Sequence, residues 1–218
     1  MNFKMPLVTL LFLFISCSEQ RQESAALENT LEAFKEGVHY ELLDNPSSVR
    51  DTNKIEVVEV FWFGCNHCYA LESYLNQWKS KNAEDVDFWK SHATWNEFLK
   101  THARMFYTAR ALGIDQQLVP AAFNTIQNEG RNLTGTTELE YYFNGFGVDK
   151  EKYKSVSSSF GVNNAVKQAD KRMKDWEITG VPTLIVNGKY KVSASRSIGT
   201  NQLLEVVDFP FVPVIVIF

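Results

Sequence analysis

A run of β-branched and aromatic residues extends from Ile55 to Phe63 and predicts a buried β-strand. Polar side chains interrupt it at only two positions. The pattern then changes to a spacing of three and four residues, which is typical of an amphipathic helix. The apolar side of this helix would consist of Tyr69, Leu71, Tyr74, Leu75 and Trp78.

A second short strand is predicted over residues 86–90, and the strand–helix–strand order favours parallel pairing of the two strands. Helical spacing then continues to Trp176. Four helices are expected to begin at capping residues, and a fifth is expected to span Val162 to Trp176. The predicted N-caps are Asn96, Asp115, Thr137 and Asp149.

Strand character returns over residues 183–186 and 189–192. The two segments flank Asn187-Gly188, the strongest short signal for a hairpin. A last helix is predicted over 202–207, and a weak strand over 39–43. A strand–helix–strand half therefore precedes the helical block and a hairpin–helix half follows it, which predicts an α/β fold with an inserted helical domain.

The N-terminus has a different pattern. Residues 7–15 are nearly all apolar, and polar residues begin directly after Cys17. An apolar run this short is typical of a signal peptide and too short for a membrane-spanning helix. Since Cys17 follows a small residue at the end of that run, the segment resembles a bacterial lipobox, and we expect Cys17 to be lipidated. The alternative is an ordinary secretory signal cleaved near Ser16.

Composition limits the possible functions. The chain has 218 residues, of which 44% are hydrophobic, enough for one domain with an insertion. Its net charge of −4 and the absence of a basic block argue against nucleic-acid binding. An exported chain works where disulfides persist.

The other two cysteines, Cys65 and Cys68, lie where the predicted strand gives way to the predicted helix. The partial positive charge and unpaired N–H groups of a helix N-terminus favour a thiolate, so the pKa of Cys65 is expected to fall. His67 adds positive charge beside it. Cys68 lies one helical turn deeper and is expected to be the shielded, resolving thiol of a redox-active pair.

Two other interpretations of this pair remain open. A structural zinc site needs four ligands, whereas the sequence has no second cysteine pair and its other histidines are scattered. A purely structural disulfide is also possible, but it gives no reason for the pair to follow a strand and open a helix. We therefore expect neither a metal nor a separate cofactor.

Three motifs together resemble the DsbA family of periplasmic thiol oxidases, over roughly residues 36 to 207. The segments Phe63–Tyr69, Gly180–Pro182 and Val186–Tyr190 correspond to the family's Cys-Pro-His-Cys motif, its Gly-Val-cis-Pro loop and its hairpin. Glu59 and Lys90 match a buried charged pair beneath the active site.

The resemblance implies a thioredoxin-like fold with an inserted all-helical domain and a role for each matching residue. Cys65 and Cys68 would be catalytic, and Asn66, His67, Glu59 and Lys90 would tune the redox properties. Pro182 is expected to be cis, which would expose the backbone of Val181 to an extended substrate. Asn66 replaces the family's proline, and the apolar tail over 210–218 replaces its usual polar helix.

The implied domains are a signal peptide (1–17), a tether (18–35), a thioredoxin-like domain (36–93 and 178–209) and an inserted helical domain (94–177). The implied function is oxidation of reduced exported proteins in the periplasm, with reoxidation by a quinone-linked membrane partner of the DsbB type and attachment to the membrane only through the lipid. The alternative functions are those of a reductase or isomerase of the same fold, and of a lipoprotein that binds metal without catalysis.

Overall fold

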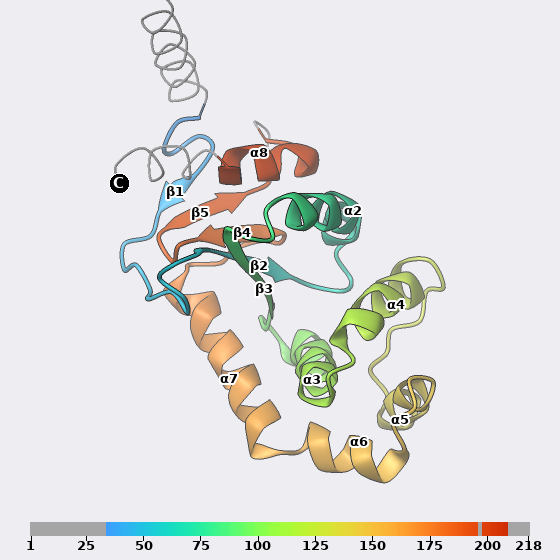
Figure 1. The fold of residues 1–218 in the computed structure, drawn as a ribbon. Helices are drawn as coiled ribbons and strands as arrows, with labels where there is room; N and C mark the ends of the chain where they lie inside the picture. Colours follow the sequence, from blue (N-terminus) through green and yellow to red (C-terminus); the bar gives the residue numbers. More distant parts are fainter. Residues whose placement is uncertain (1–33, 196–197, 209–218) are drawn as a thin grey trace, which may run out of the picture.

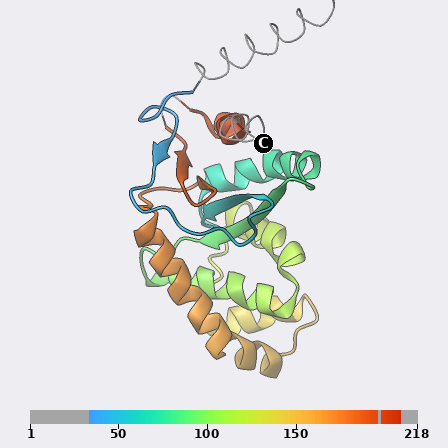
Figure 2. The same ribbon diagram turned by 60° about the vertical axis from the view of Figure 1, so that its left-hand side comes forward.

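The computed structural model describes residues 34–195 and 198–208. The expectations for the signal peptide, for nearly all of the tether and for the apolar tail fall outside these residues. The described chain forms a five-stranded sheet with helices on both faces (Figures 1 and 2). The strands are β1 (Glu41–Leu42), β2 (Ile55–Phe61), β3 (Val86–His92), β4 (Thr183–Val186) and β5 (Tyr190–Ser193).

Helix α2 (Asn66–Lys81) connects β2 to β3, and a helical segment connects β3 to β4. That segment holds α3 (Glu97–Leu112), α4 (Asp115–Gln127), α5 (Thr136–Asn144), α6 (Lys150–Ser157) and α7 (Phe160–Asp175). The described chain ends with the short 3-10 helix η1 (Thr200–Gln202) and α8 (Leu203–Asp208).

The sheet has the order β1-β5-β4-β2-β3, with β3 at one edge. As predicted, β2 and β3 are parallel, and the register places Glu59 opposite Lys90. The other pairings in the sheet are antiparallel. This arrangement places the carboxyl end of β2, and the cysteine pair that follows it, beside the start of β4.

The turn between β4 and β5 is the one that the sequence predicts. Asn187 and Gly188 both have positive φ, at 48° and 60°, as the favoured two-residue hairpin turn requires. Gly188 also packs against the backbone of Ser47, where an added Cβ would come within 2.2 Å of the Ser47 carbonyl oxygen. Both the turn conformation and this close approach therefore require glycine.

Alternate residues of β2 point to opposite faces of the sheet. Val57 packs with Leu71 and Leu75 of α2 and with the apolar side of α8. Val58 instead packs with Met173 of α7 and with Trp176 just after it. Helix α7 thus links the helical segment to the sheet, as Figure 1 shows.

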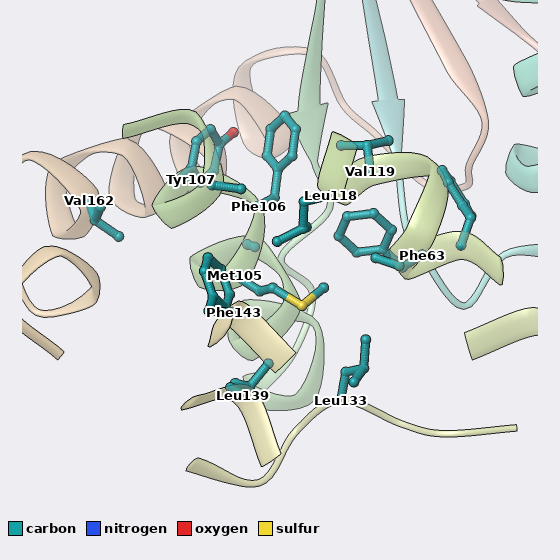
Figure 3. Packing of buried hydrophobic residues seen from close by; sticks show 14 of the residues in the cluster. Phe63, Met105, Phe106, Tyr107, Leu118, Val119, Leu133, Leu139, Phe143 and Val162 are labelled. Carbon is teal, nitrogen blue, oxygen red and sulfur yellow. The ribbon is translucent and has the colours of Figure 1, made fainter. Parts of the chain in front are cut away.

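The helical segment has an apolar core of its own, which extends up to the cysteines. Figure 3 shows Phe63, from the loop after β2, packed beside Leu118 and Val119 of α4. Cys68 belongs to the same cluster. The helices over 97–175 therefore form one wall of the site as well as a core of their own.

Several predicted boundaries were wrong. The strand predicted over 55–63 ends at Phe61, and the one predicted over 86–90 continues to His92. Strand β1 is only two residues long. Asp115 and Thr137 are not N-caps. Helices α4 and α5 instead have Ile114 and Gly135 at that position, and neither residue makes a side-chain capping hydrogen bond. Helix α7 begins after Ser159, before the predicted start at Val162. Acidic and hydroxyl residues in a first turn resemble caps in sequence, and only backbone geometry distinguishes them.

Candidate active site

Cys65 is the N-cap of α2, and Cys68 lies in the first turn of that helix. The Cys65 sulfur accepts a hydrogen bond from the backbone N–H of Cys68 at 3.3 Å, in the way that a capping oxygen does. Cys65 is partly exposed whereas Cys68 is buried, and both are free thiols. One sulfur therefore faces solvent while the other is shielded behind it.

The pKa of Cys65 falls from 9.0 to about 6. The hydrogen bond from the Cys68 thiol has the largest effect. Burial opposes it, and backbone N–H groups of Cys68 and His67 and the charge of His67 lower the pKa further. The sequence predicts this direction from the helix N-terminus and His67, but not the leading contribution of the second thiol.

The pKa of Cys68 shifts in the opposite direction. Burial raises it most, and the hydrogen bond to Cys65 and the negative charge of Glu59 raise it further. Near neutral pH the pair therefore holds one thiolate, on Cys65, and one thiol, on Cys68. Such a pair can form and break a disulfide, because Cys65 is a good leaving group and Cys68 remains close enough to resolve a mixed disulfide.

The loop before Cys65 is fixed by Trp62. Its carbonyl accepts the Cys65 N–H at 3.0 Å, and its indole N–H donates to Nδ1 of the buried His102 at 3.1 Å. His102 in turn donates from Nε2 to the Asn132 carbonyl, since a carbonyl can only accept. The indole covers Gly64 so closely that an added Cβ would lie 2.2 Å from a ring carbon. Helix α3 and the loop at residue 132 thus hold the active-site loop through one tryptophan.

The Val181–Pro182 peptide bond is cis, as the resemblance implies. The Cys65 sulfur lies 3.4 Å from the Val181 carbonyl oxygen, to which it donates a hydrogen bond when it is protonated. The cysteine pair and the loop before β4 are 116 residues apart in the sequence and meet here. Two exposed aromatic residues add apolar surface beside this site. Trp95 is 46% exposed and its indole donates to the Ile178 carbonyl. Phe98 is 41% exposed and packs on Trp62.

Beneath the cysteines lies a cluster of three charged residues. Lys90 forms ion pairs with Glu59 and, at 2.5 Å, with Glu72 of α2. Burial raises the pKa of Glu59 to about 7, although Lys90 opposes the shift. Burial alone would lower the pKa of Lys90, but the two carboxylates outweigh it and raise that pKa. One cation is thus shared by two acids, and Glu59 is the more deeply buried of the two.

The two residues between the cysteines are both exposed. His67 Nδ1 lies 3.4 Å from the Thr200 hydroxyl of η1. No side-chain hydrogen bond of Asn66 occurs within the described chain. Their position on the outer side of the first turn leaves them in contact with solvent and with any bound protein.

The structure brings together Cys65, Cys68, His67, Val181 and Pro182, with Glu59 and Lys90 below them. Cys17 lies outside the described residues. Sequence reasoning missed Glu72, although its position four residues after Cys68 places it on the same side of the helix. It also missed Gln127, which donates to the Phe63 carbonyl at 2.7 Å from 64 residues away, a contact with no local signal.

No group of three or more potential metal-ligating side chains occurs in the part of the chain that the structure describes. The fold and the site define a class of protein: a thioredoxin-like domain with a helical insertion and an active dithiol, which is a thiol:disulfide oxidoreductase.

Comparison with known proteins gives the family. A model of the DSBA-like thioredoxin domain matches residues 96–204. Thiol:disulfide interchange protein DsbA of Pseudomonas aeruginosa is 36% identical over 173 residues, covering 79% of this chain and 82% of the relative. Its counterpart from Azotobacter vinelandii is 34% identical, covering 80% of this chain and 82% of the relative.

Comparison with solved structures gives the same family. The crystal structure of Pseudomonas aeruginosa DsbA superposes with a TM-score of 0.78 at 33% identity, covering 85% of this chain and 97% of the other. Oxidoreductase DsbA from Xylella fastidiosa superposes with a TM-score of 0.77 at 26% identity, covering 84% and 98%. This chain belongs to the DsbA family of thiol:disulfide oxidoreductases.

Proposed function

We propose that the protein works in the oxidising direction, introducing disulfides into exported proteins in the periplasm. The two thiol pKa values support this direction. That of Cys65 is lowered and that of Cys68 is raised, so Cys65 is a stable thiolate once the pair is reduced. A stable reduced form is what makes a dithiol pair a strong oxidant. A reductase or isomerase would instead need a pair that gives up its electrons readily.

The cycle begins with the Cys65–Cys68 disulfide. A substrate thiolate attacks the exposed Cys65 sulfur, the bond between Cys65 and Cys68 breaks, and Cys68 takes up a proton. A second substrate thiolate then attacks the substrate sulfur of the mixed disulfide, and Cys65 leaves as a thiolate. The substrate loses two electrons and the enzyme pair gains them.

Glu59 supports the protonation of Cys68. Its carboxyl group is buried, its negative charge raises the pKa of Cys68, and one carboxyl oxygen has no hydrogen-bond partner among the described residues. Since its own pKa is about 7, it can carry a proton at neutral pH and release it to the departing Cys68 thiolate. Lys90 then balances the carboxylate that remains.

The backbone of Val181 is the expected contact for the substrate chain. Its carbonyl lies beside the sulfur that is attacked, so an extended substrate pairing with this segment would present its cysteine to Cys65. The apolar side chains of Trp95 and Phe98 suit an incompletely folded substrate, which still exposes its own apolar residues.

The two cysteines differ in role, and replacing each one separately tests this. Cys65→Ser should abolish oxidation of a reduced peptide with two cysteines. Cys68→Ser cannot form the starting disulfide either, but its Cys65 thiolate should still exchange with the oxidised peptide and accumulate mixed disulfides, because Cys68 is missing to displace the peptide sulfur. The measurement is peptide oxidation followed by mass spectrometry under non-reducing conditions. Identical behaviour of the two variants would refute the assignment.

The proposed setting is the periplasm, with a lipid on Cys17 as the membrane anchor and a quinone-linked membrane protein of the DsbB type as the oxidant. No helix among residues 34–195 and 198–208 has the length and apolar character needed to cross a membrane. Cys17→Ser should release active protein from the membrane fraction. A wild-type protein without acyl mass at its N-terminus would contradict the anchor.

A further inference from the structure

A cavity of about 480 Å³ lies beside the edge strand β3, between α3 and α7. None of the active-site residues lines it. Its charged lining residues are all arginines, and none of the described residues that line it is acidic. The residues that matter for its chemistry are Arg50, Trp89, Tyr107, Arg110, Gln168 and Arg172.

Arg172 is held in place at this cavity without a counter-ion. Its Nε donates to the Ser91 hydroxyl at 3.1 Å and its Nη2 donates to the Tyr107 hydroxyl at 3.0 Å. Its guanidinium lies 5.2 Å from the centroid of the Trp89 ring. All three partners are neutral, and no carboxylate in the described chain forms an ion pair with it. A half-buried charge in this state is stabilised by an added anion.

The Tyr107 hydroxyl marks the boundary between core and cavity. The tyrosine ring belongs to the apolar cluster of the helices, together with Met105 and Phe143. Its oxygen points away from both of these residues (Figure 3). The hydroxyl therefore orients Arg172 from the edge of the core.

Arg110 adds a second unmatched charge. It lies in the last turn of α3, is exposed, and has its guanidinium 5.7 Å from the centroid of the Phe106 ring, with no side-chain hydrogen bond or ion pair within the described chain. Arg50 is different, since its guanidinium binds Asp87 at 2.6 and 3.0 Å and also pairs with Glu56. The cavity thus has an excess of about two positive charges, from Arg110 and Arg172.

A neighbouring cavity of about 500 Å³ shows that this excess is local. It shares Arg50, Trp89 and Arg110, but its lining also contains Glu72 and Asp115 together with two lysines. Acids and bases are mixed there, so that cavity does not favour an anion.

We propose that the cavity between α3 and α7 binds a small molecule carrying a phosphate or carboxylate group. Arg172 and Arg110 would hold the anionic group, since guanidinium donors match the geometry of both anions. The face of Trp89 and the small side chains of Val162 and Ala165 would contact an apolar or aromatic remainder. The volume lies within the range typical of small-molecule sites.

The test uses phenyl phosphate as the probe, titrated by calorimetry into the full-length protein at low ionic strength. We expect saturable binding at one site, weakened about tenfold or more in Arg110→Gln, since a charge-assisted hydrogen bond to the anion is lost. Arg172→Lys should weaken it similarly, because lysine keeps the charge but not the planar donor fork. The neutral analogue benzyl alcohol should not bind.

Lys171→Gln is the matched control, since Lys171 is the neighbour of Arg172 on α7 and is already paired with Asp175. It should leave the affinity unchanged. The proposal is overturned if phenyl phosphate does not saturate, if Lys171→Gln weakens binding as much as Arg110→Gln, or if benzyl alcohol binds equally well. Because Arg110 is exposed, its variant separates loss of binding from loss of folding.

Discussion

At the scale of single residues, the chemistry depends on the unequal protonation of two sulfurs that share one helical turn. Cys65 accepts N–H groups at the start of α2, whereas Cys68 lies in the apolar cluster beneath it. Helix α2 thus stabilises the thiolate of Cys65 and holds Cys68 where a thiolate is disfavoured. The charge of His67 lowers the pKa of Cys65 less than the Cys68 thiol and the two backbone N–H groups do.

The pKa of Cys65 can be measured directly. In the reduced protein, the ultraviolet absorbance of the thiolate should rise in one step centred near pH 6, well below the ordinary thiol pKa of 9.0. Cys65→Ser should remove this step, and Cys68→Ala should shift it upward, because alanine has no side-chain donor to replace the thiol that donates to Cys65. A single step near the ordinary value would contradict the description of the site.

The sequence predicts those residues whose role is local. The positions of Cys65, His67 and Cys68 in one turn contain most of the information about the dithiol. Residues whose role depends on contacts far apart in the sequence are harder to predict. The contact of His102 with Trp62 joins residues 40 positions apart, and it depends on how α3 packs against the loop after β2.

At the scale of elements, the loop from Phe61 to Cys65 is held by packing rather than by regular hydrogen bonding. The indole of Trp62 covers Gly64, donates to His102 and packs on Phe98. The sequence predicts that this loop is still strand, because Trp62 and Phe63 are as apolar as the residues before them. Apolar runs do not distinguish a strand from a loop that is buried by another domain.

Replacing Gly64 with alanine should therefore destabilise the protein. The added Cβ would lie 2.2 Å from the Trp62 ring, so the indole must move and its hydrogen bond to His102 must break. We expect a loss of about 1–3 kcal/mol in the free energy of unfolding, the usual cost of overpacking.

Gly161→Ala is the control, because its added Cβ would have no neighbour closer than 4.0 Å and the residue lies in helix α7. Urea unfolding should show this variant unchanged or slightly more stable. Equal effects of the two substitutions would mean that the contact between Trp62 and Gly64 does not hold the loop.

At the scale of the whole molecule, the helical segment between β3 and β4 has two roles. It contributes Phe123, Gln127 and the rest of its core to the wall of the active site, and it forms the arginine-lined cavity with β3. The sequence predicts the order of helices and strands, since each has its own periodicity. The cavity was not predicted, because Arg110 and Arg172 come together only when α3 and α7 pack side by side.

The proposed oxidase activity requires that folding stabilises the reduced pair through the Cys65 thiolate. The pKa of Cys65 is lower in the folded than in the unfolded state, so this stabilisation is complete above the unfolded value of 9.0 and is lost as pH falls through about 6. The oxidised form has no such titration. Its disulfide closes a loop of only four residues, which limits what it gains from a restricted unfolded chain to about 2 kcal/mol.

Denaturant unfolding of both redox forms between pH 6 and pH 8 tests this claim. The stability of the reduced form relative to the oxidised form should rise with pH, by at most about 1.4 kcal/mol for each pH unit and by less where solvent screens the partly exposed thiolate. At pH 8 the reduced form should have the higher midpoint. Above pH 9 the raised pKa of Cys68 opposes the trend, because only the unfolded chain then loses that proton. A stability difference that does not change with pH, with the oxidised form always the more stable, would contradict the proposed oxidase.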